Sequence, residues 1–222
     1  MALTVSTPVV PPPSIALAAA SDTGVRGDGI TRLARPSFTG VAPARSSVVV
    51  YADGQLLGIA RANPRGVWAL TRPLAVGSHT ITAYAVGAGN ASSTTTTFSM
   101  SVDRTLPTAS LSYDATYKAT PTGPVTGRVT LTFSEPVQGV SLAKMRFTDP
   151  ASRTTVPLGS PILLSYVGAI TTTQLSDRSY AFTPALQAFA PGTYVLTFLK
   201  AGVVDAAGNP LAANAVTRFT SS

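Results

Sequence analysis

The sequence contains no cysteine, which removes disulfide bridges, thiolate metal sites and cysteine catalysis from consideration. It also carries little charge, because Asp, Glu, Lys and Arg make up 11% of the 222 residues, whereas globular proteins usually have about 25%. No apolar run approaches the roughly 20 residues that a membrane-spanning helix needs, so we expect no transmembrane segment. Aliphatic, hydroxyl, glycine and proline residues must therefore build both the core and the turns.

Side chains suited to catalysis are equally scarce. His79 is the only histidine and Glu135 is the only glutamate. A site with several histidines is therefore excluded, and a catalytic triad would have to be built on this single histidine. The chain has no paired-carboxylate spacing, no G-x-S-x-G motif and no glycine loop of the kind that binds phosphate. We expect no enzymatic activity and assign no catalytic residue.

The net charge of +7 is spread along the chain. Up to Arg104 there are 8 basic and 4 acidic residues (+4), and after it 8 basic and 5 acidic residues (+3). A nucleic-acid-binding protein would more often show a basic stripe with interleaved aromatic residues. We interpret the charge as a solvated basic surface and expect no nucleic-acid partner.

What the first half does contain is short alternating runs, about seven of them at intervals near ten residues. This spacing is typical of a β-sandwich. Asp53-Gly54 lies between two apolar runs and predicts a β-hairpin. The expected strands are residues 15–17, 36–41, 46–51, 56–59, 66–70, 79–86 and 94–102.

The second half repeats this pattern and is also expected to be β. Its expected strands are residues 108–113, 128–134, 144–149, 162–167, 179–183, 193–199 and 215–220. Between the halves, Ser101–Pro107 is interpreted as a taut hinge, because the residue before a proline favours extended backbone. We therefore predict a Pro-rich linker over residues 1–14, one domain over 15–104 and a second over 105–222. Met1–Ala20 lacks a basic n-region, so we expect no signal peptide, and the start looks like a cut from a longer chain.

Several motifs of the first half resemble, in order and spacing, the bacterial Ig-like repeats of large secreted adhesins. These motifs are Ser21–Gly24, Gly27–Thr31, Pro36–Gly40, Val48–Gly54, Gly66–Trp68, Gly77–Ala83 and Val102–Pro107. The resemblance covers residues 15–107. Motifs at Val129–Val137, Tyr194–Thr197 and Asp205–Leu211 resemble a second class of bacterial Ig-like domain, over residues 108–222. The resemblance implies an all-β fold of two tandem Ig-like β-sandwich domains, with Trp68 in the core of the first.

The resemblance also implies a metal. In the adhesin repeats, carboxylates near the start of a domain and in the linker often share calcium, and calcium binds several oxygen ligands. Asp22, Asp28 and Asp103 occupy the matching positions and are the candidate ligands. This chain departs from the family where it has Leu33 and Val86, since the family often has Asp there. The alternative is that these aspartates cap turns and pair with nearby arginines such as Arg104.

The function implied is that of a non-catalytic structural spacer in a large bacterial secreted or cell-surface, adhesin-like protein. Its partners would be the neighbouring Ig-like domains of the parent chain, and its location extracellular. Two alternatives stay open: a glycan- or matrix-binding accessory module of an exported protein, and a subunit that assembles with copies of itself into a surface fibre. Six of the seven tyrosines lie in or beside expected strands, which argues against an aromatic sugar-binding platform.

Overall fold

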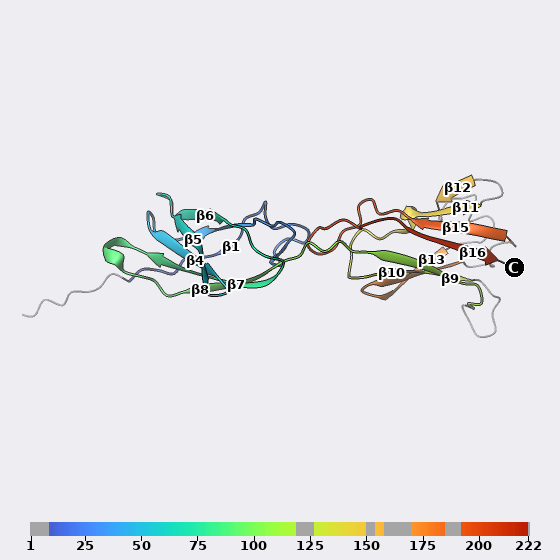
Figure 1. Ribbon diagram of the computed structural model, residues 1–222, viewed down its shortest axis with the longest axis horizontal. Helices are drawn as coiled ribbons and strands as arrows, with labels where there is room; N and C mark the ends of the chain where they lie inside the picture. The colour runs from blue at the N-terminus through green and yellow to red at the C-terminus, as the bar shows by residue number, and fades with distance from the viewer. Residues whose placement is uncertain (1–8, 119–126, 150–153, 158–169, 185–191, 222) are drawn as a thin grey trace, which may run out of the picture. The chain divides into compact units, whose positions relative to one another are not determined.

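The computed structural model describes residues 9–118, 127–149, 154–157, 170–184 and 192–221 (Figure 1). The chain divides into two compact units, residues 1–104 and residues 105–222. Apart from short 3-10 turns at Ala88–Asn90 and Leu142–Lys144, the described residues form strands, turns and loops. The predicted all-β fold is confirmed.

The first unit is a sandwich of two sheets. One sheet has the order β1-β3-β6 and the other has the order β2-β8-β7-β4-β5. Neighbouring strands are antiparallel except β2 and β8, which pair in parallel. The strands are β1 (Ala16–Leu17), β2 (Ile30–Thr31), β3 (Ser37–Val41), β4 (Ser47–Ala52), β5 (Gln55–Arg61), β6 (Val67–Thr71), β7 (Gly77–Val86) and β8 (Thr96–Val102).

Alternation along these strands places one apolar face of each sheet inside the sandwich. Phe38 and Trp68 come from the three-stranded sheet and meet Val50 and Ile81 from the five-stranded sheet. Trp68 is 1% exposed, which confirms its expected place in the core. Its indole Nε1 donates a hydrogen bond to the Ser14 carbonyl at 3.2 Å, so its one polar atom is satisfied.

The chain joins this sandwich earlier than Ile15. The backbone N–H of Ser14 donates to the Val41 carbonyl at 2.8 Å, and the Ser14 hydroxyl accepts from the Val41 N–H. Pro13 is buried, and its carbonyl accepts a hydrogen bond from the Thr96 hydroxyl at 2.7 Å. Residues 13 and 14, which the sequence analysis assigns to a linker, are thus bonded to the first unit.

The second unit also consists of two antiparallel sheets, β13-β14-β10-β9 and β12-β11-β15-β16. Their inner faces share one core, with Leu131 and Phe182 from the first sheet and Leu196 and Phe198 from the second. The strands are β9 (Ala109–Asp114), β10 (Arg128–Phe133), β11 (Met145–Asp149), β12 (Thr154–Pro157), β13 (Ile170–Ser176), β14 (Ser179–Pro184), β15 (Gly192–Phe198) and β16 (Ala215–Ser221).

Most expected strands are present, with ends shifted by one or two residues. The strand expected at residues 162–167 lies outside the described residues. Three strands are not expected from the sequence: β2, β12 and β13. β2 has only two residues, and its pairing with β8 joins segments about 70 positions apart, which no local pattern indicates.

Candidate functional site

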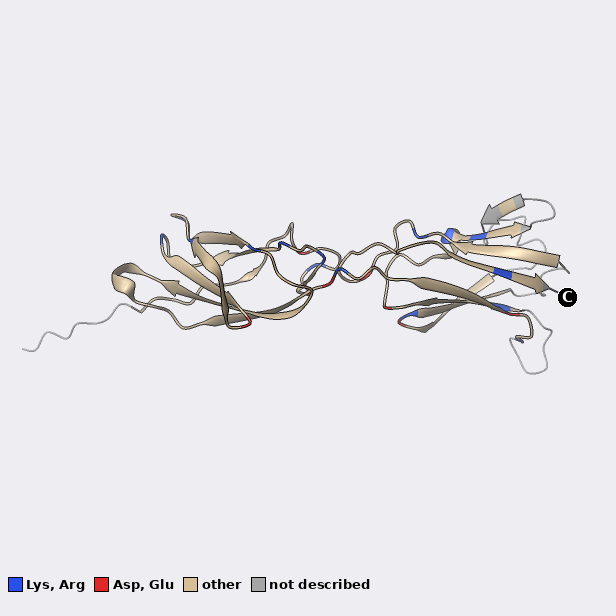
Figure 2. Cartoon of the chain, viewed as in Figure 1, with Lys and Arg blue, Asp and Glu red and all other residues tan. Residues whose placement is uncertain are grey.

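The strand register of the first unit places all of its acidic residues at one end of the sandwich. At this end β4 runs into the Asp53-Gly54 turn, β7 begins beside the last residue of β8, and β2 pairs with that same part of β8. Asp22 and Asp28 lie in the loop before β2, and Asp103 follows β8. We call this the acidic end. It also carries five arginines, which are Arg26, Arg32, Arg35, Arg72 and Arg104. Figure 2 shows lysine and arginine in blue and aspartate and glutamate in red.

Two of the candidate calcium ligands hold turns. Asp22 Oδ2 accepts a hydrogen bond from the Gly27 N–H at 2.7 Å, and Asp28 Oδ1 accepts one from the Ile30 N–H at 2.8 Å. These are the capping contacts expected of aspartates in loops. The second oxygen of Asp22, Oδ1, is buried and has no hydrogen-bond partner among the described residues. That oxygen has capacity for one more donor or a cation.

The structure brings Asp22, Asp28 and Asp103 to the same end of the domain but not into one cluster. Within the described part of the chain, their carboxylate oxygens do not all lie within 4.8 Å of one another. The backbone N–H of Asp103 donates to the Thr31 carbonyl at 2.9 Å, which extends the pairing of β2 with β8. Calcium binding by these three residues stays a prediction.

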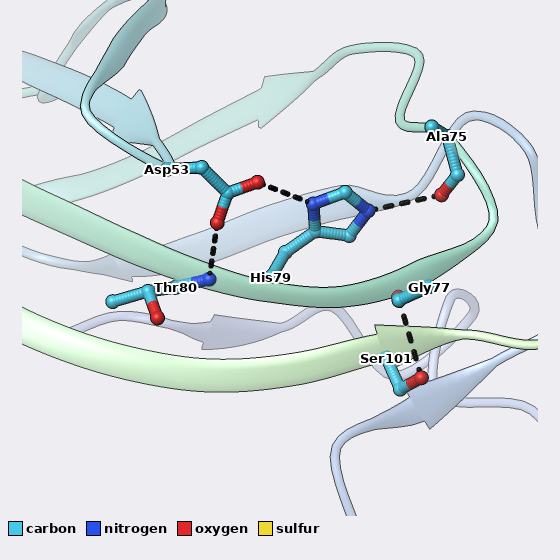
Figure 3. A network of polar contacts seen from close by, with 6 residues as sticks. All are labelled: Asp53, Ala75, Gly77, His79, Thr80 and Ser101. Atoms are coloured by element: carbon cyan, nitrogen blue, oxygen red, sulfur yellow. Dashed lines mark hydrogen bonds and ion pairs between the residues drawn. The ribbon is translucent and has the colours of Figure 1, made fainter.

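The acidic end contains a polar network that no sequence motif predicts (Figure 3). His79 Nδ1 lies 2.7 Å from Asp53 Oδ2, and His79 Nε2 lies 3.0 Å from the Ala75 carbonyl oxygen. Asp53 Oδ1 accepts a hydrogen bond from the Thr80 N–H at 2.8 Å. The network therefore ties the β4–β5 turn and the β6–β7 loop to the start of β7.

The geometry determines the charge of His79. A neutral imidazole has one donor nitrogen and one acceptor nitrogen, but here both nitrogens face oxygen acceptors, so only the imidazolium can donate both hydrogen bonds. Burial alone would lower the pKa of His79. The hydrogen bonds to Asp53 and to the Ala75 carbonyl, with the negative charge of Asp53, outweigh it and raise the pKa above 6.5. The hydrogen bonds from His79 and from the Thr80 backbone hold the pKa of Asp53 below 3.8.

A groove of about 320 Å³ lies beside this network. Its walls come from the loop before β2 and from the facing parts of β7 and β8. Asp28 and His79 supply the ionisable groups, and serine and threonine side chains supply hydroxyls. Such a lining suits hydrogen bonding to a small polar ligand.

In the second unit, the loop at Asp205–Asn209 is held by its own side chains. Asp205 is 2% exposed and its two oxygens accept hydrogen bonds from the backbone N–H and side-chain amide of Asn209, at 2.8 and 3.0 Å. A carboxylate oxygen of the single glutamate, Glu135, lies within 4.8 Å of one of Asp205.

Two tyrosines that are distant in the sequence stack against each other on adjacent strands. Tyr51 on β4 and Tyr84 on β7 are partly buried, their ring centroids are 6.3 Å apart and the rings are 21° from parallel. Strand register explains the pair, since Tyr51 faces Thr82 and Val49 faces Tyr84 across adjacent strands. The pair lies on the outer face of the five-stranded sheet, and neither of its rings is fully exposed.

Comparison with protein families assigns both halves. A family model described as a bacterial Ig-like domain matches residues 9–104, and a second model with the same description matches residues 118–221. The chain consists of two bacterial Ig-like domains. This confirms the resemblance drawn from the motifs. No curated protein matches the chain.

Several solved structures resemble the pair of Ig-like domains at low identity. The fibronectin(III)-like modules of CbhA from Clostridium thermocellum give a TM-score of 0.37 at 12% identity, covering 94% of this chain and 94% of that chain. A 1.5-MDa bacterial ice-binding adhesin gives 0.46 at 14% identity, covering 97% of this chain and 66% of that chain. At such identities and scores, neither likeness bears on function. No helix in the described part of the chain is long and apolar enough to cross a membrane.

Proposed function

We propose that this chain is a non-catalytic spacer module of a bacterial surface or secreted protein, in which the two Ig-like domains hold other domains of the parent chain at a distance. The proposal is supported by the assignment of both halves to bacterial Ig-like domains. It is supported further by where the chain enters and leaves each domain.

In the first domain the entry and exit lie at opposite ends of the sandwich. Ser14 enters beside Val41, at the end where β3 finishes and β6 begins. The exit at Val102 lies beside Gly77, at the end where β6 has finished and β7 begins. A module that is entered at one end and left at the other adds its own length to a chain.

The second domain has the same property. The Pro107 carbonyl, just before β9, accepts a hydrogen bond from the Ala212 N–H, just before β16. The far ends of the same two strands meet where the Tyr113 and Phe219 rings lie 3.9 Å apart. The chain therefore enters at the start of β16 and leaves at its end. This entry and exit geometry is the observation that carries the spacer proposal.

Single-molecule force spectroscopy on the two-domain chain tests this role. A spacer under tension should give two separate unfolding events, each lengthening the chain by at most about 35 nm, for roughly 100 residues at about 3.5 Å per residue. The chain should also stay monomeric at all concentrations in light scattering. Unfolding of either domain at negligible force, without a resolved event, would contradict the proposal.

Self-assembly is the second candidate, and one observation favours it. Among the described strands of the second domain β13 lies at a sheet edge, its residues from Thr171 to Ser176 are exposed, and none of its seven residues is charged or proline. Edges without such protection tend to pair with another chain. If copies associate through this edge, then Thr172→Lys should abolish concentration-dependent association, while Thr97→Lys, on β8 of the first domain, should not.

A further inference from the structure

Opposite the acidic end of the first domain lies an end with no acidic residue. There β4 begins at Ser47, paired with Arg61 at the end of β5 on one side and with Val86 at the end of β7 on the other. Three loops leave from these neighbouring strand ends, residues 42–46, 62–66 and 87–95. The aspartates of residues 9–104 all lie at the acidic end, so these loops face no carboxylate of their own domain.

Three arginines occupy this end, which we call the arginine end: Arg45, Arg61 and Arg65. All three are exposed. Within the described part of the chain, no hydrogen bond or ion pair involves their guanidinium groups. The charge of the domain is therefore divided unequally, because the arginine end carries +3 from three arginines and no acid. The acidic end carries +1 from five arginines and four aspartates, or +2 when His79 is protonated.

Asn63 holds the backbones of the two arginine loops together. Its carbonyl accepts hydrogen bonds from the N–H of Arg45 at 3.4 Å and of Gly66 at 2.9 Å. Its side-chain Oδ1 accepts from the N–H of Arg65 at 2.9 Å and of Val67 at 3.0 Å. Arg45 has a φ of 63°, a region that non-glycine residues occupy at some cost. The arginines thus project from a fixed backbone, although their guanidinium groups are unpartnered.

The third loop adds neutral polar groups to the same end. Residues 87–95 contain no charged or aromatic side chain, and Asn90, Ser92, Thr94 and Thr95 are exposed. A groove of about 370 Å³ runs between this loop and residues 9–12. Unpartnered guanidinium groups suit carboxylate or sulfate, and exposed hydroxyls suit the hydroxyls of a sugar.

We propose that the arginine end is a binding site for an anionic polysaccharide, with Arg45, Arg61 and Arg65 contacting its carboxylate or sulfate groups. Charge complementarity favours a polyanion, since the three guanidinium groups have no competing acid on their own end. The loops 42–46, 62–66 and 87–95 contain no aromatic residue. They therefore lack the stacking surfaces that single-stranded nucleic acids use.

Affinity measurements on the purified two-domain chain test the proposal, with alginate, heparin, neutral dextran and duplex DNA as probes. The variant is Arg45→Gln/Arg61→Gln/Arg65→Gln. The matched control is Arg32→Gln/Arg35→Gln/Arg218→Gln, which removes the same charge from exposed arginines that make no side-chain hydrogen bond within the described residues. Melting curves of all three proteins check that each is folded.

We expect the natural chain to bind alginate or heparin, more weakly at high salt, and to ignore dextran. The arginine-end variant should lose about tenfold in affinity, because three exposed ion pairs are lost, and the control variant less than about threefold. Equal losses in both variants would show a general charge effect and overturn the site. Tighter binding to DNA than to either polysaccharide would overturn the assigned partner, and absence of binding to both polysaccharides would overturn the proposal.

Discussion

At the scale of single residues, His79 makes the clearest prediction. Its raised pKa means that the protonated ring stabilises the folded first domain fully below about pH 6.5, and that this stabilisation is lost as the pH rises through the folded-state pKa. The lowered pKa of Asp53 has the opposite sense, and its contribution is lost as the pH falls through its folded-state pKa. The pair therefore stabilises most between about pH 4 and pH 6.5.

We expect His79→Gln to lower the melting temperature of the first domain more at about pH 5.5 than at about pH 8. Thermal unfolding of the natural chain and the variant across this range measures the difference. Thr97→Val, on the outer face of β8, is the control, and it should change the melting temperature by the same amount at both pH values. A His79→Gln cost that does not change with pH would show that the pKa of the ring is the same in the folded and the unfolded protein.

Asp22 carries the calcium prediction, because its Oδ1 is buried without a hydrogen-bond partner. If a cation completes this site, millimolar calcium should raise the melting temperature relative to chelator, since an ion that binds only the folded state stabilises it by mass action. Asp22→Asn and Asp103→Ala should each abolish the rise, while Asp53→Asn should not. An unchanged melting temperature in calcium would leave Asp22 and Asp28 as turn-capping residues.

At the scale of elements, the attachment of residues 13–14 to β3 depends on Gly40. A Cβ at this position would meet the Ser14 carbonyl, and it would lie 2.9 Å from Trp68 Nε1. Gly40→Ala should therefore displace the Ser14 segment and remove the indole hydrogen bond, at a cost of roughly 1–3 kcal/mol. Urea unfolding of the first domain measures this cost.

Gly58→Ala on β5 is the matched control for that change. There the nearest atoms belong to the side chains of Arg72 and Leu70, at 3.1 to 3.3 Å, and the exposed Arg72 can move. We expect a smaller loss of stability than for Gly40→Ala. Equal losses in the two variants would indicate a general cost of alanine in strands and not a specific attachment of Ser14.

Short sequence patterns predict the strands and turns whose structure depends on neighbouring residues. Asp53-Gly54 predicted the β4–β5 hairpin because both residues take positive φ, 51° and 80°, which this residue pair tolerates. β13 was missed because Ile170-Thr171-Thr172-Thr173 lacks apolar alternation, and its side chains are exposed on both faces of an edge. β2 was missed because its only partner is distant in sequence.

The candidate sites also divide into residues that a local motif indicates and contacts that only the folded chain brings together. The aspartates were visible as motif residues, but whether three of them share one ion depends on how separate loops approach each other. The contact of His79 with Asp53 joins residues 26 positions apart, and its only sequence signal was an Asp-Gly turn in a chain with a single histidine. No local pattern indicates the arginine end, because strand pairing places Arg61 beside Ser47 and the contacts of Asn63 join the loops of Arg45 and Arg65.

At the scale of the whole molecule, each Ig-like domain has a core of its own, one built around Ile81 and Trp68 and the other around Leu131 and Phe198. Since each core is complete within its domain, we expect residues 9–104 and residues 105–222 to fold as separate fragments. Ile81→Ala should destabilise the first domain by about 2–5 kcal/mol, and Leu131→Ala the second by a similar amount, because both side chains are fully buried.

Calorimetry of the full chain then shows whether the domains unfold independently. Each substitution should lower the midpoint temperature of one unfolding transition. The other transition should stay at the temperature measured for its separate fragment, since the lost contacts lie within a single core. A shift of both transitions by either substitution would mean that the domains unfold as one cooperative unit. Two independent transitions are what a spacer requires, because a module that unfolds under load must not take its neighbour with it.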